Sequence, residues 1–456
     1  MATSQTTLAM PITGKCFAFF CLSFFLVISA SAQSYGIDDS LKHIPRSRSG
    51  SISDVVKFIE EKALSDKDKA RGAYYYVAHT IRYDVNKFLK DEPSYSDPIE
   101  VFEKRKAVCI GYANLYREMC TRMGLTCKVI SGYSRGYGYR KGQEFTETDH
   151  AWNAVKIDST WYLVDATWAS GDIQKKFYKQ WFVQKFYDDF FGVAPEEFIL
   201  THAPDMPMWQ LLDYPVSMKN FAAGNVKLKK PETSEKGRYH YLDTINAYFT
   251  LDETHQLWQH GRMAVRYNKK NTISMAYGML FPIVSLAEKK SFVNADMPLY
   301  TVDSMITVIT SATDLLKKKT GSRKAIKELA TKNLDIAQDL LSELYLMKAE
   351  FYEKRIRIEN ISSFDTLMYC SRPMIESCEK AIRVSHDNKN SKLSNELNND
   401  LCERHMFFYY KFRGMLMKEE DAKKRKVIQK QIDLHLSSAK KFATVKSPCY
   451  RFLKEL

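Results

Sequence analysis

The protein has 456 residues, of which 45% are hydrophobic and 27% are charged. This composition is typical of a globular chain with room for two or three domains, and it argues against disorder on a large scale. The net charge of +14 favours anionic partners, such as acidic peptides, phospholipid headgroups or cell-wall polymers. Lys and Arg are scattered among Glu and Asp in helical patterns, and the sequence has no nucleic-acid motif. We therefore expect solvated helix faces, no nucleic-acid partner, and an anionic cell-surface component as a candidate ligand.

The first 32 residues have the order of a secretory leader. Lys15 precedes an almost unbroken apolar run, Cys16–Ile28, and the small residues Ser29–Ala32 follow. This order predicts a signal peptide at residues 1–32, cleaved before Gln33. The apolar run is short for a membrane span of about 20 residues. We expect a secreted or periplasmic protein, with membrane anchoring as the alternative if the leader is not cleaved.

Helices are predicted first in the segment that follows. After a linker at residues 33–50, apolar residues at helical spacing predict a helix over Asp54–Ile81, with a break and a new N-cap at Ser65. The clearest helix is Val108–Met123, and Gly124 provides its C-terminal cap.

Strands are predicted next. Runs of β-branched and aromatic residues predict them at Thr126–Tyr133, His150–Ile157 and Trp161–Trp168. Between the first two lies Ser134–Asp149, rich in Gly, Tyr and charge, which we predict to be a mobile surface loop.

A second domain is predicted to begin near residue 215, where Pro204, Pro207 and Pro215 interrupt the chain. Residues 51–215 then form one domain, and residues 216–456 form an α-helical domain with long runs such as Ser322–Arg357 and Ser394–Ser437. Helices of moderate length in succession are typical of a helical-hairpin array, although no strict repeat is found. A protein partner is a candidate ligand of this helical domain.

Seven of the nine cysteines lie beyond the leader. An odd number without regular spacing argues against a disulfide framework and leaves at least one free thiol. Cys120 and Cys127 are predicted to be core thiols, or alternatively a disulfide pair.

Cys109 lies where the chain passes from loop to helix. A thiol acts as a nucleophile through its thiolate form, which a helix N-terminus and a neighbouring imidazolium both stabilise. The free N–H groups of a first helical turn also suit an oxyanion. We expect the small residues Gly111 and Ala113 to let a substrate backbone approach closely. The alternative is a buried structural cysteine.

His150 and Asp165 are placed together by a predicted hairpin. If Asp158 and Ser159 form a two-residue loop, Ile157 pairs with Thr160, and counting outward makes His150 a diagonal neighbour of Asp165 on one sheet face. The carboxylate could then accept the imidazole N–H and stabilise the imidazolium. A three-residue loop would put the two side chains on opposite faces. The alternative role for Asp165 is to bind backbone N–H groups at a strand end.

These blocks resemble the transglutaminase-like superfamily of papain-like cysteine enzymes. The matching segments are Ala107–Ala113, Asp149–Asn153 and Trp161–Trp168, and Tyr76–Asp84 is similar to a helix of kyphoscoliosis-peptidase-like members. The resemblance covers roughly residues 50–215, and it implies an α+β fold with the cysteine-bearing helix on an antiparallel sheet.

The resemblance also implies a catalytic triad of Cys109 as nucleophile, His150 as general base and acid, and Asp165 as orienting carboxylate. An acyl-thioenzyme formed from a protein or peptide amide can pass to water or to an amine, and we favour hydrolysis, that is, a cysteine peptidase or amidase. Tyr83 is a weak candidate for the second oxyanion donor. No cofactor or metal is expected. The alternative is a non-catalytic scaffold with a helical interaction domain.

Other residues have simpler explanations. A zinc site of Cys109, Cys120, Cys127 and His150 is disfavoured, because Cys109 and Cys120 lie about 16 Å apart along one helix. No acidic loop has the spacing of a calcium site. Trp152 and Trp168 are expected to pack against the sheet, and His202 is expected to be a loop residue.

Overall fold

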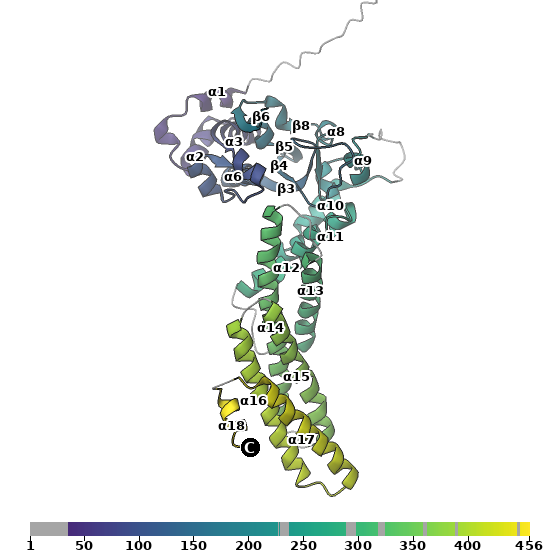
Figure 1. Ribbon diagram of the computed structural model, residues 1–456. Helices are drawn as coiled ribbons and strands as arrows, with labels where there is room; N and C mark the ends of the chain where they lie inside the picture. Colours follow the sequence, from purple (N-terminus) through teal and green to yellow (C-terminus); the bar gives the residue numbers. More distant parts are fainter. Residues whose placement is uncertain are drawn as a thin grey trace, which may run out of the picture.

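The computed structural model describes residues 35–226, 228, 237–288, 298–317, 324–358, 363–387, 391–444 and 447–456. A mixed domain built on a small sheet lies at one end of the molecule, and long helices extend from it (Figure 1). The predicted signal peptide, residues 1–32, lies outside the described residues. Among the helices described, none combines the length and apolar character of a membrane span.

The helices at the start of the described chain cover one side of the sheet. They are α1 (Gly36–Lys42), η1 (Arg46–Arg48), α2 (Ile52–Lys62) and α3 (Asp66–Thr80). The predicted break between α2 and α3 is confirmed, because the Ser65 side chain caps α3 by accepting from the Asp68 N–H. The expected linker at residues 33–50 instead contains α1, whose Ile37 and Leu41 are buried in the core.

A five-stranded antiparallel sheet occupies the centre of the domain, in the order β8-β5-β4-β3-β9. The strands are β3 (Thr126–Ser134), β4 (His150–Ile157), β5 (Thr160–Val164), β8 (Phe191–Val193) and β9 (His202–Pro204). The middle strand, β4, is buried on both faces. Val155 and Ile157 pack with α3 and α6 (Cys109–Arg122), and Trp152 and Ala154 pack on the other side. The α+β fold and the cysteine-bearing helix on an antiparallel sheet are confirmed.

The hairpin between β4 and β5 has the predicted register. Ile157 pairs with Thr160, which leaves Asp158 and Ser159 as a two-residue loop, and Asp158 adopts a φ of 53°. The predicted strand to Trp168 is too long, since β5 ends at Val164. It ends there because the Asp165 side chain caps the short helix α7 (Ala166–Ala169).

Smaller elements surround the sheet. They are β1 (Arg82–Tyr83), α4 (Val85–Lys90), α5 (Pro98–Lys104), β2 (Lys106–Ala107), β6 (Gly171–Lys176), β7 (Lys179–Gln184), η2 (Asp188–Phe190), α8 (Pro195–Phe198), η3 (Pro207–Gln210) and α9 (Met218–Ala222). Strands β1 and β2 form a short parallel pair, and β6 and β7 form a separate antiparallel hairpin.

The segment between β3 and β4 is only partly a surface loop. Tyr137 is 49% exposed, as expected for such a loop. Phe145, however, is buried and packs against Tyr133 and Phe221. This side chain anchors the loop, because a buried aromatic ring holds the backbone on either side of it.

Most of the described residues beyond α9 lie in helices. These helices are α10 (Tyr241–Phe249), α11 (Glu253–Tyr267), α12 (Thr272–Glu288), α13 (Leu299–Lys317), α14 (Lys324–Ile358), α15 (Phe364–Asp387), α16 (Ser391–Leu416), α17 (Ala422–Phe442) and α18 (Pro448–Leu453). From α11 to α17 each helix packs on the next one along the chain.

The first of these helices contact the sheet domain directly. The Phe249 ring of α10 stacks on Trp161 of β5 at 5.8 Å, and Asn271, the residue before α12, donates a hydrogen bond to the Tyr133 hydroxyl. The boundary near residue 215 stays a prediction. The last helix is tied back by a disulfide between Cys402 of α16 and Cys449 of α18.

Candidate active site

Cys109 is the first residue of α6, with Val108 as the N-cap. The sequence folds this way because the short β2 strand ends at Ala107 and helix-forming residues follow it. The thiol is partly buried and is not part of a disulfide, and it lies near enough to His150 to contribute, after Asp165, to the raised pKa of that imidazole.

The small residues of this turn serve packing. A Cβ at Gly111 would lie 2.5 Å from the carbonyl oxygen of Tyr95 and 2.5 Å from the Cβ of Ala107, and Ala113 is buried. The expectation that both residues leave room for a substrate backbone is therefore wrong, because this space is filled by the protein's own chain.

His150 opens β4 and meets the carboxylate that follows β5. Its Nε2 lies 2.8 Å from Oδ2 of Asp165. The other oxygen of Asp165, Oδ1, accepts the backbone N–H groups of Thr167 and Trp168 at 2.8 and 3.1 Å. The carboxylate thus fills both roles considered from the sequence, because one oxygen caps a helix while the other holds an imidazole.

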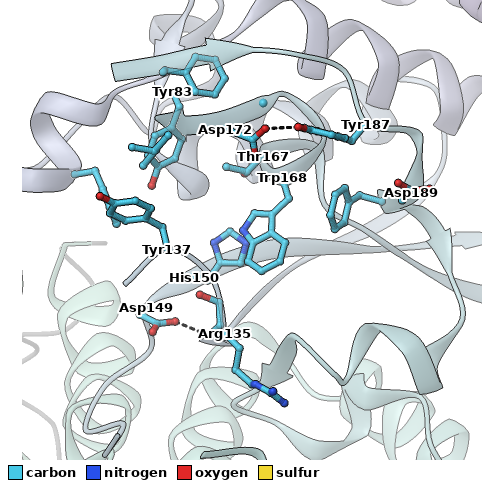
Figure 2. Close-up of a pocket in the computed structure, with 17 residues that line it drawn as sticks. Tyr83, Arg135, Tyr137, Asp149, His150, Thr167, Trp168, Asp172, Tyr187 and Asp189 are labelled. Carbon is cyan, nitrogen blue, oxygen red and sulfur yellow. Dashed lines mark hydrogen bonds between the residues drawn. The ribbon is translucent and has the colours of Figure 1, made fainter. Parts of the chain in front are cut away.

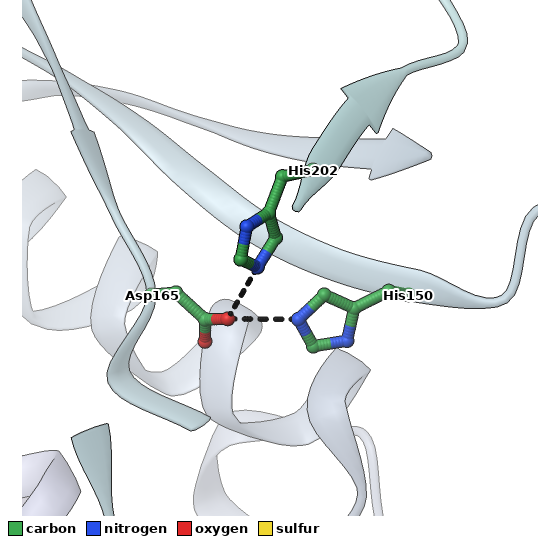
Figure 3. Close-up of side chains that lie close together, drawn as sticks. All are labelled: His150, Asp165 and His202. Atoms are coloured by element: carbon green, nitrogen blue, oxygen red, sulfur yellow. Dashed lines mark hydrogen bonds and ion pairs between the residues drawn. The ribbon is translucent and has the colours of Figure 1, made fainter. Parts of the chain in front are cut away.

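His202 also bonds to Asp165, which sequence reasoning missed. It belongs to the edge strand β9, and its Nε2 lies 3.1 Å from the same Oδ2 atom (Figure 3). The Thr201 hydroxyl lies 2.8 Å from Nδ1 of His202, and the ring stacks on Phe198 at 4.1 Å. The interpretation of His202 as a loop residue is wrong. No local signal in the sequence places it here, because the contact depends on how β9 pairs with β3.

Burial and charge set the protonation of this group. Burial disfavours the imidazolium, but the charge and hydrogen bond of Asp165 outweigh it and raise the pKa of His150 to about 10. Burial likewise opposes ionisation of Asp165, yet the charge of His150 and the bonds from both histidines lower its pKa. Burial lowers the pKa of His202 to about 4, against the raising effect of Asp165. At neutral pH the group is an imidazolium–carboxylate pair beside a neutral histidine.

His150, Asp165 and His202 also have residue types that bind metal ions, with ligand atoms within 4.8 Å of one another. Both Nε2 atoms, however, lie at hydrogen-bonding distance from one carboxylate oxygen. A neutral His202 ring carries one proton. Since Nδ1 of His202 accepts from the Thr201 hydroxyl, the proton is on Nε2 of His202, and this nitrogen donates to Asp165. We therefore interpret this trio as a hydrogen-bonded group that orients His150.

A cavity of about 620 Å³ adjoins His150. The ring of His150 lies beside Trp168 within this cavity, and Tyr83, Tyr137 and Tyr187 stand around it (Figure 2). Aromatic residues form the largest group in its lining, and Asp149, Asp172 and Asp189 also border it. The full set is Tyr83, Phe88, Ser134, Arg135, Gly136, Tyr137, Asp149, His150, Thr167, Trp168, Gly171, Asp172, Ile173, Phe182, Tyr187, Asp189 and Phe190. A cavity of this size and chemistry can hold a side chain and a short stretch of peptide.

The tryptophans have separate positions. Trp152 is buried in the sheet core, as expected, and Trp168 lines the cavity while its ring lies 4.3 Å from that of His202. Tyr83 lines the same cavity. Cys120 and Cys127 are buried free thiols, which confirms the prediction of core thiols over a disulfide.

Comparison with known proteins agrees with this geometry. Residues 53–166 match the family model described as the transglutaminase-like superfamily. Kyphoscoliosis peptidase of Mus musculus is 36% identical over 188 residues, and that of Homo sapiens is 35% identical over 188 residues; each alignment covers 41% of this chain and 28% of the relative. Lim and transglutaminase domain protein ltd-1 of Caenorhabditis elegans is 31% identical over 199 residues, which cover 41% of this chain and 27% of the relative.

The matched region spans less than a third of the length of these curated relatives. It contains Cys109, His150 and Asp165, and it coincides with α2, α3, α6 and the sheet strands β3 to β5. Residues 53–166 therefore form a domain of the transglutaminase-like superfamily, in the branch similar to kyphoscoliosis peptidase.

Proposed function

We propose that the protein is an exported cysteine enzyme that forms an acyl-thioenzyme at Cys109 from protein or peptide amides and passes the acyl group to water. The single observation that carries this proposal is the position of Cys109 at the start of a helix near His150, whose ring lies 2.8 Å from the Asp165 carboxylate. An imidazolium beside a thiol at a helix N-terminus favours the thiolate, which is the nucleophilic form.

The steps follow from these positions. The sulfur of Cys109 attacks the amide carbonyl carbon, and backbone N–H groups of the first turn of α6 stabilise the oxyanion. The C–N bond then breaks as His150 gives its proton to the leaving amine. Water attacks the thioester while His150 takes a proton from it, and the C–S bond breaks to release a carboxylic acid. Asp165 holds the imidazole in place during both halves of the reaction.

Labelling with iodoacetamide tests the nucleophile. We expect Cys109 to be modified near neutral pH far faster than Cys120 and Cys127, which are buried, and His150→Ala to slow the labelling of Cys109 alone. Mass spectrometry of tryptic peptides reads each site separately. Equal, slow labelling of all three thiols would contradict the proposal and favour the non-catalytic scaffold.

A peptide library with and without a primary amine tests the reaction. Cleavage, deamidation and amine incorporation give three distinct mass changes, and hydrolysis predicts that products form without the amine. Incorporation of the amine in preference to water would replace hydrolysis by acyl transfer while leaving the acyl-enzyme intact. The Cys109→Ala variant is the control and is expected to be inactive.

Export is part of the proposal and has its own support. The disulfide Cys402–Cys449 joins helices of the C-terminal region, and disulfides persist mainly in oxidising compartments. N-terminal sequencing of the protein recovered from the producing organism is expected to give Gln33 as the first residue. Recovery from the cytosol with residues 1–32 present would contradict export.

A further inference from the structure

The hairpin of β6 and β7 ends in two aromatic residues. Lys176 pairs with Lys179, so Phe177 and Tyr178 form the whole two-residue loop. Their side chains are 83% and 85% exposed. The hairpin is a two-stranded sheet separate from the central one. In Figure 1 β6 lies on the sheet domain away from the long helices α13–α17.

Folding alone does not account for aromatic residues in this loop. Two-residue hairpin loops favour Asn-Gly or Asp-Gly, because their first residue needs a positive φ. Phe177 adopts a φ of 54°, which is strained for a bulky side chain. The other such loop of this domain has Asp158, with a φ of 53°, followed by Ser159. The Phe177–Tyr178 loop therefore lacks favourable turn residues and exposes two rings, and such a departure points to a function.

Lysines surround the two rings. Lys175, Lys176 and Lys179 are exposed beside the loop, and Trp181, further along β7, is 41% exposed. Aromatic rings concentrate at the headgroup level of bilayers, where lysine stems extend so that the ammonium groups reach anionic phosphates. Lysines near an anionic surface each add to binding.

The small size of this tip favours a lipid surface over a protein partner. Two aromatic side chains bury about 150–250 Å² each, whereas a stable protein interface buries about 800 Å² on each partner. A projecting tip can enter a deformable lipid interface without a matching groove on the other side.

We propose that the Phe177–Tyr178 tip inserts into the interface of an anionic phospholipid bilayer, with Lys175, Lys176 and Lys179 on the headgroups. The base of the same hairpin lines the cavity beside His150 through Asp172, Ile173 and Phe182. Docking of the tip therefore holds this cavity near the lipid surface, where it meets peptides that are bound to membranes.

Vesicle flotation tests the proposal. The chain starting at Gln33, which retains every described residue, is mixed with phosphatidylcholine vesicles that contain or lack phosphatidylserine. We expect binding to the anionic vesicles only, and weaker binding as salt is raised. Phe177→Asn with Tyr178→Gly is expected to lower affinity at least about tenfold through loss of two buried rings. This variant keeps its fold, because it installs the favoured turn residues; its urea midpoint is expected to equal or exceed that of the parent.

The lysines are tested in the same assay. Replacing Lys175, Lys176 and Lys179 with Gln is expected to lower the affinity for anionic vesicles about fivefold per lysine. The charge control replaces the exposed Lys423, Lys424 and Lys426 of α17 with Gln, and the exposure control is Leu64→Ser, since Leu64 is 96% exposed. Both controls are expected to bind as the parent does.

Several results would overturn the proposal. They are the absence of binding to anionic vesicles, unchanged binding by the tip variant, and a loss of affinity in the α17 control equal to that in the variant of Lys175, Lys176 and Lys179. Tip-dependent capture of an acidic polypeptide without any binding to vesicles would assign the tip to a protein partner instead. The Cys109→Ala variant is expected to bind vesicles normally, so failure of the proposed catalysis does not affect this result.

Discussion

Nε2 of His202 lies 3.1 Å from Oδ2 of Asp165, so a histidine of the edge strand β9 shares the carboxylate that orients His150. Two imidazoles on one oxygen fix that oxygen in space, and the helix-capping bonds to Oδ1 fix the other. The carboxylate is therefore held from three directions before any substrate binds. This arrangement makes the orientation of His150 a property of the folded domain.

Asp165→Asn is expected to reduce turnover about 10⁴-fold, the loss typical of a triad carboxylate changed to an amide. The amide oxygen can still cap α7, so the fold is retained. Loss of the negative charge lowers the pKa of His150 from about 10, so the imidazolium that stabilises the Cys109 thiolate is weakened and the rise of Cys109 labelling with pH shifts to higher pH. A pH series of iodoacetamide labelling checks this, and an unchanged pH profile would show that Asp165 does not act on His150.

His202→Phe is expected to lower turnover about tenfold to a hundredfold, since it removes one hydrogen bond to a buried charge. Phenylalanine keeps the stacking on Phe198 and the contact with Trp168. We expect kcat to fall with little change in KM, and His202→Gln, which retains a donor, to recover part of the loss. The control is His255→Ala, because His255 is a surface residue bonded to Asp252. A loss of turnover in His255→Ala equal to that in His202→Phe would argue against a positioning role for His202. A change in KM alone in His202→Phe would argue against it as well.

Gly111→Ala is expected to destabilise the domain by about 1–3 kcal/mol through overpacking, because the new methyl would meet the Tyr95 carbonyl oxygen at 2.5 Å. The matched control is Gly414→Ala in α16, where a Cβ meets nothing within 4 Å. That change is expected to stabilise by about 0.5–1 kcal/mol through helix propensity. Urea unfolding followed by circular dichroism measures both, and effects of the same sign in the two variants would contradict this account.

The helical region is expected to lose stability as the pH falls from 7 to 5. Nδ1 of His405 on α16 lies 2.9 Å from Nδ1 of His435 on α17. Burial, with the charge of His435, lowers the pKa of His405 to about 3, and burial lowers that of His435 to about 4. Both stay neutral when folded, whereas each takes up a proton near pH 6.5 when unfolded. The unfolded state therefore binds more protons below pH 6.5, and stability falls by up to about 1.4 kcal/mol per pH unit for each histidine.

Hydrogen–deuterium exchange of α16 and α17 at pH 5 and pH 7, corrected for intrinsic exchange rates, measures this loss. The variant with His405→Leu and His435→Leu is expected to show a much smaller pH dependence in these two helices. An equal dependence in parent and variant would assign the effect to other groups, such as the buried His202 of the sheet domain.

The order of elements in the sheet domain could be predicted from local sequence. The helix containing Cys109 and the strand from His150 to Ile157 were predicted within one or two residues. The hairpin register followed from a count of residues, because side chains alternate along a strand and a two-residue loop fixes the pairing. The end of β5 was missed because Asp165 uses its side chain to cap a helix, which apolar periodicity does not indicate.

Local patterns of residues were enough to predict a cysteine at a helix start and a histidine and an aspartate that face each other across a hairpin, since each placement depends on residues close in the chain. Only the tertiary structure decided that His202 joins this group, that Gly111 is filled by Tyr95 and Ala107, and that Cys402 meets Cys449. These contacts join segments many residues apart. Their geometry depends on strand order and helix packing, which no local pattern of residues specifies.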